Sequence, residues 1–496
     1  MKNLLKILLL VIIVLLFVLF GLLFTQKGND IAKPYLKAEL EKQIGLPVEV
    51  DLFMLRYDNI ALKIIINNGL SVDVKSIFNL ISQEFDGIYK IYAQNFFYEG
   101  ISLDEANING EYSGVPNDVY VNGKGTSFNA PLNYKLRILN GEAKEIIFNL
   151  KDMQIAKLLS LAKQPAFAQG KMDANVSIPT LVKDSLDGKI NISLDEIMLN
   201  ETLLKNEYNL TLPQNTKFQV SIESLLKGEE VKSNINMYSN LADVNLSDIT
   251  FNTTTQYVDA NYRIDVANLK NLYALTHIEM RGALLLNGHI KKAKTLKITG
   301  VTHSLGGALD YVFEDGNFNS FITEVPVENV LKMFKFPQFM GARASGKTLY
   351  HIVNEKGTLK FVLDNFQLAP NKITKNIGKF FPIDPTAMMF PKTLLEAEIN
   401  SDEVIYTFVA KSKGAFINIG KGRINHQKDS HEAKIKFGYK KYTMSGSIGG
   451  SIRHPHIGFD TTGFLKDNMM MNKAMTNRAK KVLGGSFGKY LKGLGF

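Results

Sequence analysis

The sequence predicts a mostly β protein, in which an apolar N-terminal helix precedes a long, repetitive antiparallel sheet with short helical interruptions. Three observations predict this fold. Apolar and polar residues alternate with a period of two along most of the chain beyond residue 100, turn dipeptides separate the alternating runs, and one long apolar stretch lies at the N-terminus. The 496 residues are 45% hydrophobic and 21% charged, which is globular usage and excludes a disordered chain.

The N-terminus is predicted to be a membrane anchor. Residues 7–24 form an apolar run of 18 residues, close to the roughly 20 that cross a hydrocarbon core about 30 Å thick. The segment Leu22–Lys27 offers no small-residue cleavage site, which favours an uncleaved signal anchor over a cleaved signal peptide. Lys2 and Lys6, within residues 1–6, place the N-terminus in the cytoplasm by the positive-inside rule.

A juxtamembrane helix is predicted at 29–45. Asn29 or Asp30 can cap its N-terminus, and Gly45 can end it in the left-handed conformation. An extended segment begins at Pro47, so a first strand is expected directly after the helix.

The body of the chain is predicted to be strands with one apolar and one polar face, as in antiparallel sheets exposed to water on one side. Ten apolar positions from four such runs are the candidate binding residues: Ile190, Ile192, Leu194, Phe218, Val220, Leu359, Phe361, Leu363, Ile435 and Phe437. Turn signals between runs occur at Asn140-Gly141, Asp187-Gly188, Asp315-Gly316 and Lys356-Gly357.

An internal repeat is visible in the helical interruptions. Short amphipathic helices are predicted at 154–161, 266–273 and 327–334, and each leads to a glycine and then to an alternating strand. Such short helices cannot cover the apolar face of so many strands. The sheet must therefore close on itself as a sandwich or barrel, or curl into a trough that holds apolar ligand, and the periodicity leaves both open.

The C-terminal segment 464–496 concentrates positive charge. It has seven basic residues and one acidic residue, Asp467, which gives +6 of the formal net charge of +10. A basic amphipathic helix is predicted here, for docking onto a membrane or a partner, with an end cap on the last strands as the alternative. The candidate docking residues are Met471, Met475, Arg478, Lys480, Lys481, Val482 and Leu483.

Motifs for catalysis or metal binding are sparse. Residues 341–348 match the P-loop pattern G-x4-G-K-[ST], but the flanking sequence predicts strands where a P-loop needs a following helix, so the match is interpreted as coincidence. His454 and His456 lack a third ligand, and the chain has no Cys. We expect no catalytic residue, no metal, no cofactor and no enzymatic activity.

Two short motifs carry a family resemblance. The first is Leu40-x3-Ile44-Gly45-x-Pro47-Val48-x-Val50, and the second is Gly446-Ser447-Ile448 followed by the stretch 454–460, HPHIGFD. With the order of anchor, helix, β body and basic tail, they resemble the AsmA/TamB-like family of Gram-negative envelope proteins, which are bridge-like lipid transfer proteins. The resemblance implies a chorein-like β region at 46–150 and, at 151–463, an elongated, repetitive, groove-like (taco-shaped) antiparallel sheet.

The resemblance implies an inner-membrane, single-pass protein whose bulk lies in the periplasm. Its groove, lined by the apolar candidates, would bind phospholipid and transfer it between inner and outer membranes, which supports outer-membrane lipid homeostasis. The alternative is an envelope assembly or scaffolding factor for outer-membrane protein biogenesis, with a closed β core and no lipid cargo. Expected partners are phospholipid, the inner membrane, and the outer membrane or an outer-membrane or periplasmic protein. A nucleic acid is not expected, because the basic chain faces away from the cytoplasm.

Overall fold

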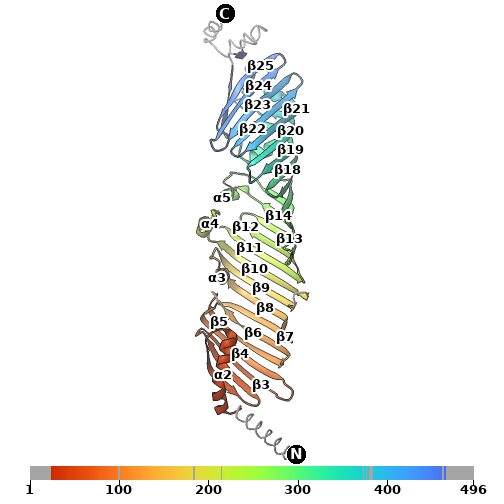
Figure 1. Ribbon diagram of the computed structural model, residues 1–496. Coiled ribbons are helices and arrows are strands. Elements are labelled where there is room, and N and C mark those ends of the chain that lie inside the picture. Colours follow the sequence, from red (N-terminus) through yellow and green to blue (C-terminus); the bar gives the residue numbers. More distant parts are fainter. Residues whose placement is uncertain are drawn as a thin grey trace, which may run out of the picture. The chain divides into compact units, whose positions relative to one another are not determined.

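The computed structural model describes residues 24–98, 101–181, 185–213, 215–371, 374–375, 377–378, 384–460 and 463–464. The predicted span at 7–24 and the predicted docking segment at 464–496 lie outside these residues, except for their inner ends. Within the described part of the chain, no helix is both long and apolar enough to cross a membrane. The chain divides into two compact units: unit 1 is Met1–Asn240 with Ser247–Thr255, and unit 2 is Leu241–Leu246 with Gln256–Phe496. Figure 1 labels the helices and strands along the chain.

Unit 1 is a meander of antiparallel strands, each paired with the next in the sequence, with one helix before the first strand and two short helices between later strands. Its elements are α2 (Gln26–Ile44), β1 (Val48–Leu55), β2 (Asn59–Ile66), β3 (Leu70–Phe78), β4 (Phe85–Tyr98), β5 (Ile101–Val115), β6 (Asp118–Ser127), β7 (Ala130–Leu139), β8 (Glu142–Gln154), α3 (Ile155–Leu161), β9 (Ala168–Thr180), β10 (Asp187–Leu199), α4 (Glu201–Tyr208), β11 (Lys217–Lys227) and β12 (Glu230–Ser239). Strand β13 (Asp243–Asn252) has residues in both units.

Unit 2 is also an antiparallel meander interrupted by short helices. Its elements are β14 (Val258–Val266), η2 (Leu269–Leu272), α5 (Tyr273–Thr276), β15 (Leu284–Lys292), β16 (Leu296–Thr302), β17 (Ala308–Glu314), β18 (Asn317–Pro326), α6 (Val327–Met333), β19 (Met340–His351), β20 (Lys356–Leu368), η3 (Pro385–Ala387), β21 (Met389–Asn400), β22 (Glu403–Ser412), β23 (Ala415–Asn425), β24 (Ser430–Tyr439), β25 (Tyr442–Gly450) and β26 (Pro455–Phe459). Neighbouring strands again pair antiparallel, from β14 to β26.

Helix α2 begins earlier than the sequence predicts. Its cap is Thr25, whose Oγ1 accepts a hydrogen bond from the Gly28 N–H, so the expected cap at Asn29 or Asp30 is wrong. Asn29 instead uses its side-chain amide to bond the backbone of Leu55 in β1. The predicted stop is confirmed, because Gly45 has φ +73° and its N–H bonds the carbonyl of Glu41.

Two of the four predicted turn dipeptides form tight hairpin turns. Asn140-Gly141 and Asp315-Gly316 link strands directly, with positive φ at both residues of each pair, which suits the right-handed twist of a hairpin. The other two predictions are wrong, because Asp187 and Lys356 already begin β10 and β20. In the β19–β20 connection the turn precedes Lys356, and Glu355 has the positive φ.

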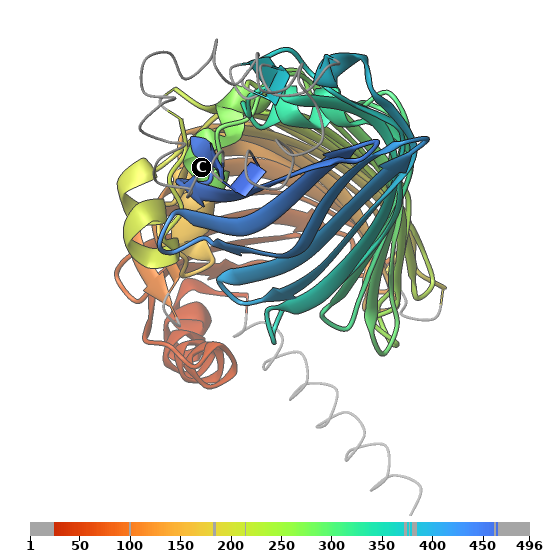
Figure 2. The same ribbon diagram turned by 90° about the horizontal axis from the view of Figure 1, so that it is seen from above.

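The predicted helical interruptions are present, as α3, as η2 with α5, and as α6. Each precedes a strand of the expected kind, β9, β15 and β19. A further helix, α4, was not predicted, and its Asn200 cap accepts a hydrogen bond from the Leu203 N–H. In unit 1, α2 lies alongside the first strands, which Figure 2 shows in red and orange.

Candidate functional site

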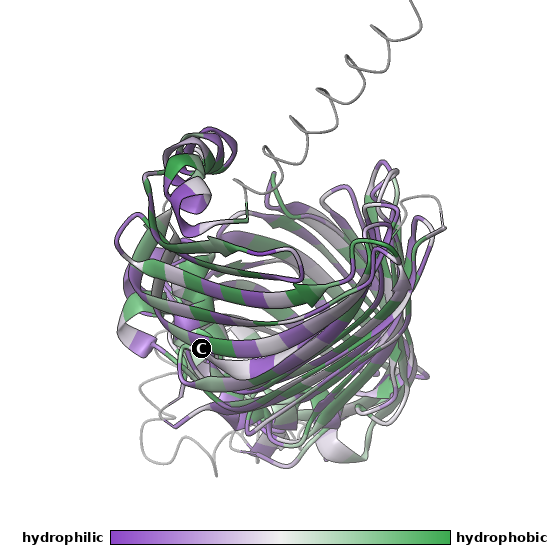
Figure 3. Cartoon of the chain, turned by 90° about the horizontal axis from the view of Figure 1, so that it is seen from below, coloured by the Kyte–Doolittle hydropathy of each residue, from purple (hydrophilic) through white to green (hydrophobic). Residues whose placement is uncertain are grey.

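Register places apolar residues of successive strands in unit 1 on one face of the sheet, because directly paired residues point the same way. Leu194 of β10 pairs with Met172 of β9 and with Val220 of β11, and Val220 pairs with Met237 of β12. A β-bulge between Leu194 and Ile197 adds one residue to β10. Ile197 therefore pairs with Phe218 and lies on the same face as Leu194. We call this surface the apolar face of unit 1. Figure 3 shows the alternation of hydrophobic and hydrophilic residues as green and purple blocks along the strands.

All five unit 1 candidates lie on the apolar face and are only partly buried: Ile190, Ile192, Leu194, Phe218 and Val220. Helices cover part of this face. Leu40 and Ile44 of α2 pack against residues of β1 and β2, and Leu158 and Leu161 of α3 pack with residues of β8 and β9.

The five unit 2 candidates also share one face, but their burial differs. Leu359 and Phe361 of β20 and Ile435 of β24 are partly buried. Leu363 is 3% exposed and Phe437 is 2% exposed. Both belong to a cluster of buried hydrophobic residues, most of them on β19–β25, which we call the unit 2 core and which includes Phe366, Phe390, Phe408 and Met444.

A tyrosine bracket that the sequence analysis missed crosses the apolar face of unit 1. The ring of Tyr89 in β4 lies over Gly110 of β5, and its hydroxyl donates to the carbonyl of Asn122 in β6. The same hydroxyl meets that of Tyr134 in β7 at 2.5 Å, over Gly123. The pKa of Tyr89 is raised mainly by burial and further by the hydrogen bond to Tyr134.

Unit 2 contains the same bracket. Tyr262 of β14 lies over Gly288 of β15, its hydroxyl donates to the carbonyl of Thr299 in β16, and it bonds the hydroxyl of Tyr311 in β17. Gly300 occupies the place of the second glycine beneath the hydroxyls. Burial and the bond to Tyr311 raise the pKa of Tyr262. The two units thus share a tertiary arrangement of Tyr–Gly–Gly–Tyr on four successive strands.

A related contact lies nearer the C-terminus of unit 2. Tyr406 of β22 lies over Gly422 of β23, and its hydroxyl is 2.6 Å from Nε2 of His431 in β24. Burial raises the pKa of Tyr406 to about 12 and lowers the pKa of His431. The lowered pKa favours the neutral ring of His431, whose Nε2 can accept a hydrogen bond from the Tyr406 hydroxyl.

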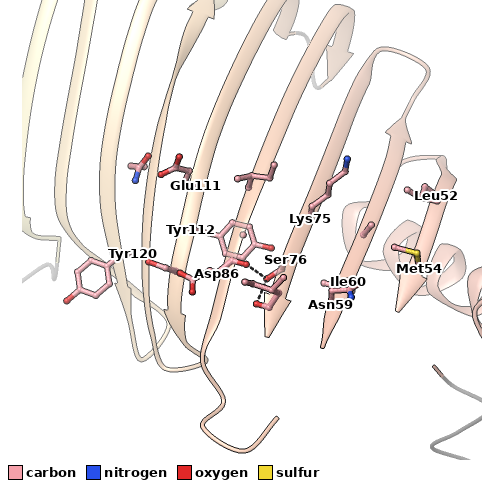
Figure 4. Close-up of a pocket in the computed structure, with 16 residues that line it drawn as sticks. Leu52, Met54, Asn59, Ile60, Lys75, Ser76, Asp86, Glu111, Tyr112 and Tyr120 are labelled. Carbon is pink, nitrogen blue, oxygen red and sulfur yellow. Dashed lines mark hydrogen bonds between the residues drawn. The ribbon is translucent and has the colours of Figure 1, made fainter. Parts of the chain in front are cut away.

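The opposite, polar face of unit 1 contains a hollow of about 750 Å³ (Figure 4). Most of its lining side chains come from the polar-face positions of β1–β6, yet several of these are apolar, such as Leu52, Ile77 and Ile88. The remaining lining residues are Met54, Asn59, Ile60, Ala61, Lys75, Ser76, Asp86, Gly87, Glu111, Tyr112, Ser113, Tyr120 and Asn122. The hollow was not predicted, because the apolar residues that form it interrupt the alternation on which the sequence analysis relied.

The P-loop-like stretch does not have P-loop structure. Residues 341–348 lie within β19, and Lys347 pairs with Phe321 and Lys360 of the flanking strands. No helix N-terminus follows to receive a phosphate, so interpreting the match as coincidence is confirmed for this segment. Among the described residues, no group of three or more His, Asp or Glu side chains is arranged to hold a metal ion.

The predicted docking residues of the C-terminal segment, from Met471 to Leu483, lie outside the described residues.

Comparison with known proteins gives no matching family model, no matching curated protein and no matching solved structure.

Proposed function

We propose that this protein binds the acyl chains of phospholipid along the apolar face and transfers phospholipid between the inner and outer membranes, in support of outer-membrane lipid homeostasis. In this proposal residues 7–24 anchor the chain in the inner membrane, the body lies in the periplasm, and the sheet is an open, taco-shaped groove. The protein acts by binding and needs no catalytic residue or cofactor.

One observation carries the proposal. The partly buried candidates of β10 and β11 lie on one face of the sheet, and the neighbouring strands β9 and β12 present apolar side chains to the same side. Apolar area that the protein itself does not cover favours an apolar ligand by roughly 25 cal/mol for each Å² removed from water. Acyl chains are suitable because they need no hydrogen-bond partners along their length.

The test uses two neighbouring residues on opposite faces of β11. A photoreactive amino acid is placed at Val220, on the apolar face, or at Gln219, which is exposed on the polar face. The full chain is crosslinked in cells, purified, and examined for covalent phospholipid by mass spectrometry. Adducts at Val220 and their absence at Gln219 are expected, and equal labelling or no labelling at the two positions would refute the proposal.

The unit 2 core favours a second candidate function, an envelope assembly or scaffolding factor without lipid cargo. Phe366 and Phe390 are essentially fully buried there, with ring centroids 5.6 Å apart, so this part of the sheet has little apolar surface to offer a lipid. The same crosslinking design separates the two functions when it is repeated at Phe361. Protein adducts in place of lipid adducts at both Phe361 and Val220 would favour the scaffold.

A further inference from the structure

One end of the unit 1 sheet is the end at which α2 begins. The Asn29 side chain bonds both the N–H and the carbonyl of Leu55, at 3.0 and 3.1 Å, which fixes the first turn of α2 beside the last residue of β1. The Phe78 N–H bonds the carbonyl of Asp58 at 2.8 Å, which ties the end of β3 to the β1–β2 turn. The β1–β2 turn and the β3–β4 loop therefore lie at this same end.

This end exposes large apolar side chains, which we call the apolar rim: Tyr57, Ile77, Leu80 and Ile81. Ile81 is 96% exposed and Tyr57 is 68% exposed. Single exposed apolar residues are ordinary, but four at one end of a sheet indicate a contact surface. Ile77 also lines the hollow on the polar face, so the rim and the hollow are continuous.

The β3–β4 loop is ordered in a way that leaves its apolar residues outside. Asn79 Oδ1 accepts hydrogen bonds from the N–H groups of Ile81 and Ser82, at 2.9 and 3.2 Å. The Asn79 N–H bonds the carbonyl of Glu84, and the Ser82 hydroxyl bonds the Glu84 carboxylate. The polar residues of the loop thus bond one another, while Ile81 projects into solvent.

We propose that the apolar rim inserts into the interface of the bilayer that holds residues 7–24. This inference rests on the proposed function, because it requires that the apolar N-terminal run is a membrane anchor. The run ends at Phe24, and Thr25 caps α2. Two residues of chain span less than about 8 Å, so the first turn of α2 and the rim beside it start close to the membrane surface. Exposed Ile, Leu and Tyr side chains are suited to the boundary between headgroups and acyl chains.

The absence of Cys from the chain makes the test direct. Single variants Ile81→Cys and Leu225→Cys are labelled with an environment-sensitive dye in the full chain and reconstituted into phosphatidylethanolamine–phosphatidylglycerol vesicles. Leu225 is the control, because it is 55% exposed on the polar face of β11, away from the rim. Spin-labelled phospholipid is then added as a quencher that acts only at short range.

A blue-shifted emission at position 81 and quenching at least about twofold stronger than at position 225 are expected for an inserted side chain. Equal quenching at the two positions would overturn the inference. A blue shift at position 81 without quenching by lipid would also overturn it, because that result indicates burial of the dye against protein, such as a second copy of this chain, and not in lipid. These outcomes are independent of the crosslinking at Val220, so failure of the rim and failure of the lipid-binding face are distinguishable.

Discussion

The Tyr89 hydroxyl lies 2.5 Å from the Tyr134 hydroxyl, although two strands separate β4 from β7. The contact exists because Gly110 and Gly123 leave room for the rings to lie flat across the sheet. Since Tyr89 donates to the Asn122 carbonyl, its hydroxyl oxygen can accept the hydrogen bond from Tyr134. The hydroxyl is thus satisfied both as a donor and as an acceptor on an apolar surface. Its recurrence in unit 2 shows that the two units repeat in packing as well as in strand order.

The glycine beneath Tyr89 is predicted to be essential for the bracket. A Cβ at Gly110 would overlap both the Tyr89 ring and the Asn122 carbonyl oxygen, so Gly110→Ala must displace the ring or separate the strands. We expect a loss of about 1–3 kcal/mol, measured by urea unfolding followed by far-UV circular dichroism. Gly420→Ala is the control, because no atom lies within 4 Å of the place that its Cβ would occupy. Equal stability of the two variants would contradict the prediction.

Asn29 is predicted to protect the free edge of β1. It is 4% exposed and replaces a neighbouring strand by bonding both backbone groups of Leu55. Asn29→Ala should cost about 1–3 kcal/mol, because it leaves buried polar groups unpaired. It should also promote oligomers through the uncovered edge, visible by size-exclusion chromatography. Lys33→Ala, which removes a single exposed bond to Asp51, should do neither.

The effect of a charge on the apolar side of the sheet should depend on how deeply the substituted residue is buried. Val220→Asp places a carboxylate on a partly buried position, so we expect the chain to fold but to lose lipid crosslinking from a neighbouring probe at Phe218. Phe437→Asp places the charge in the unit 2 core and should cost about 3 kcal/mol or more. Thermal melts of both variants test this contrast. Equal melting temperatures would contradict the burial of position 437 in the unit 2 core.

The stability of unit 2 is predicted to fall in mild acid through His431. Burial lowers its pKa below the ordinary value of 6.5, so in this range the unfolded chain binds more protons than the folded one. Stability is therefore present above pH 6.5 and is lost as the pH falls through the folded pKa. His431→Gln keeps an acceptor for the Tyr406 hydroxyl but cannot titrate, so its stability should depend less on pH in this window. Parallel pH dependence in the two proteins, measured by urea unfolding, would contradict the assignment.

The period-two pattern was sufficient to predict much of the fold. It placed all ten candidate residues on strands and predicted that those of one strand point to the same face. The register confirms that the candidates within each unit share one face of the sheet. Boundaries were harder to predict. Asp187-Gly188 has the composition of a turn but begins β10, because pairing with β9 and β11 extends the strand over a local preference.

Burial could not be read from the same pattern. Ile435 and Phe437 are two residues apart on one face of β24, yet Ile435 is partly buried and Phe437 is fully buried. The difference arises from residues distant in sequence, such as Met444 of β25 and Ile417 of β23, which pair with Phe437. The hollow on the polar face was missed for a similar reason, since Ile77 and Ile88 are brought together only when β3 and β4 pair near the end of the sheet.

The sequence by itself determined the alternation of the strands, the hairpin glycines Gly141 and Gly316 and the stop of α2 at Gly45, because these depend on interactions between residues close in the chain. Only the tertiary structure decided which apolar residues are covered, how the tyrosine brackets span four strands, and where the apolar rim gathers. Those features depend on contacts between residues such as Tyr89 and Tyr134, whose encounter depends on the register of every strand between them.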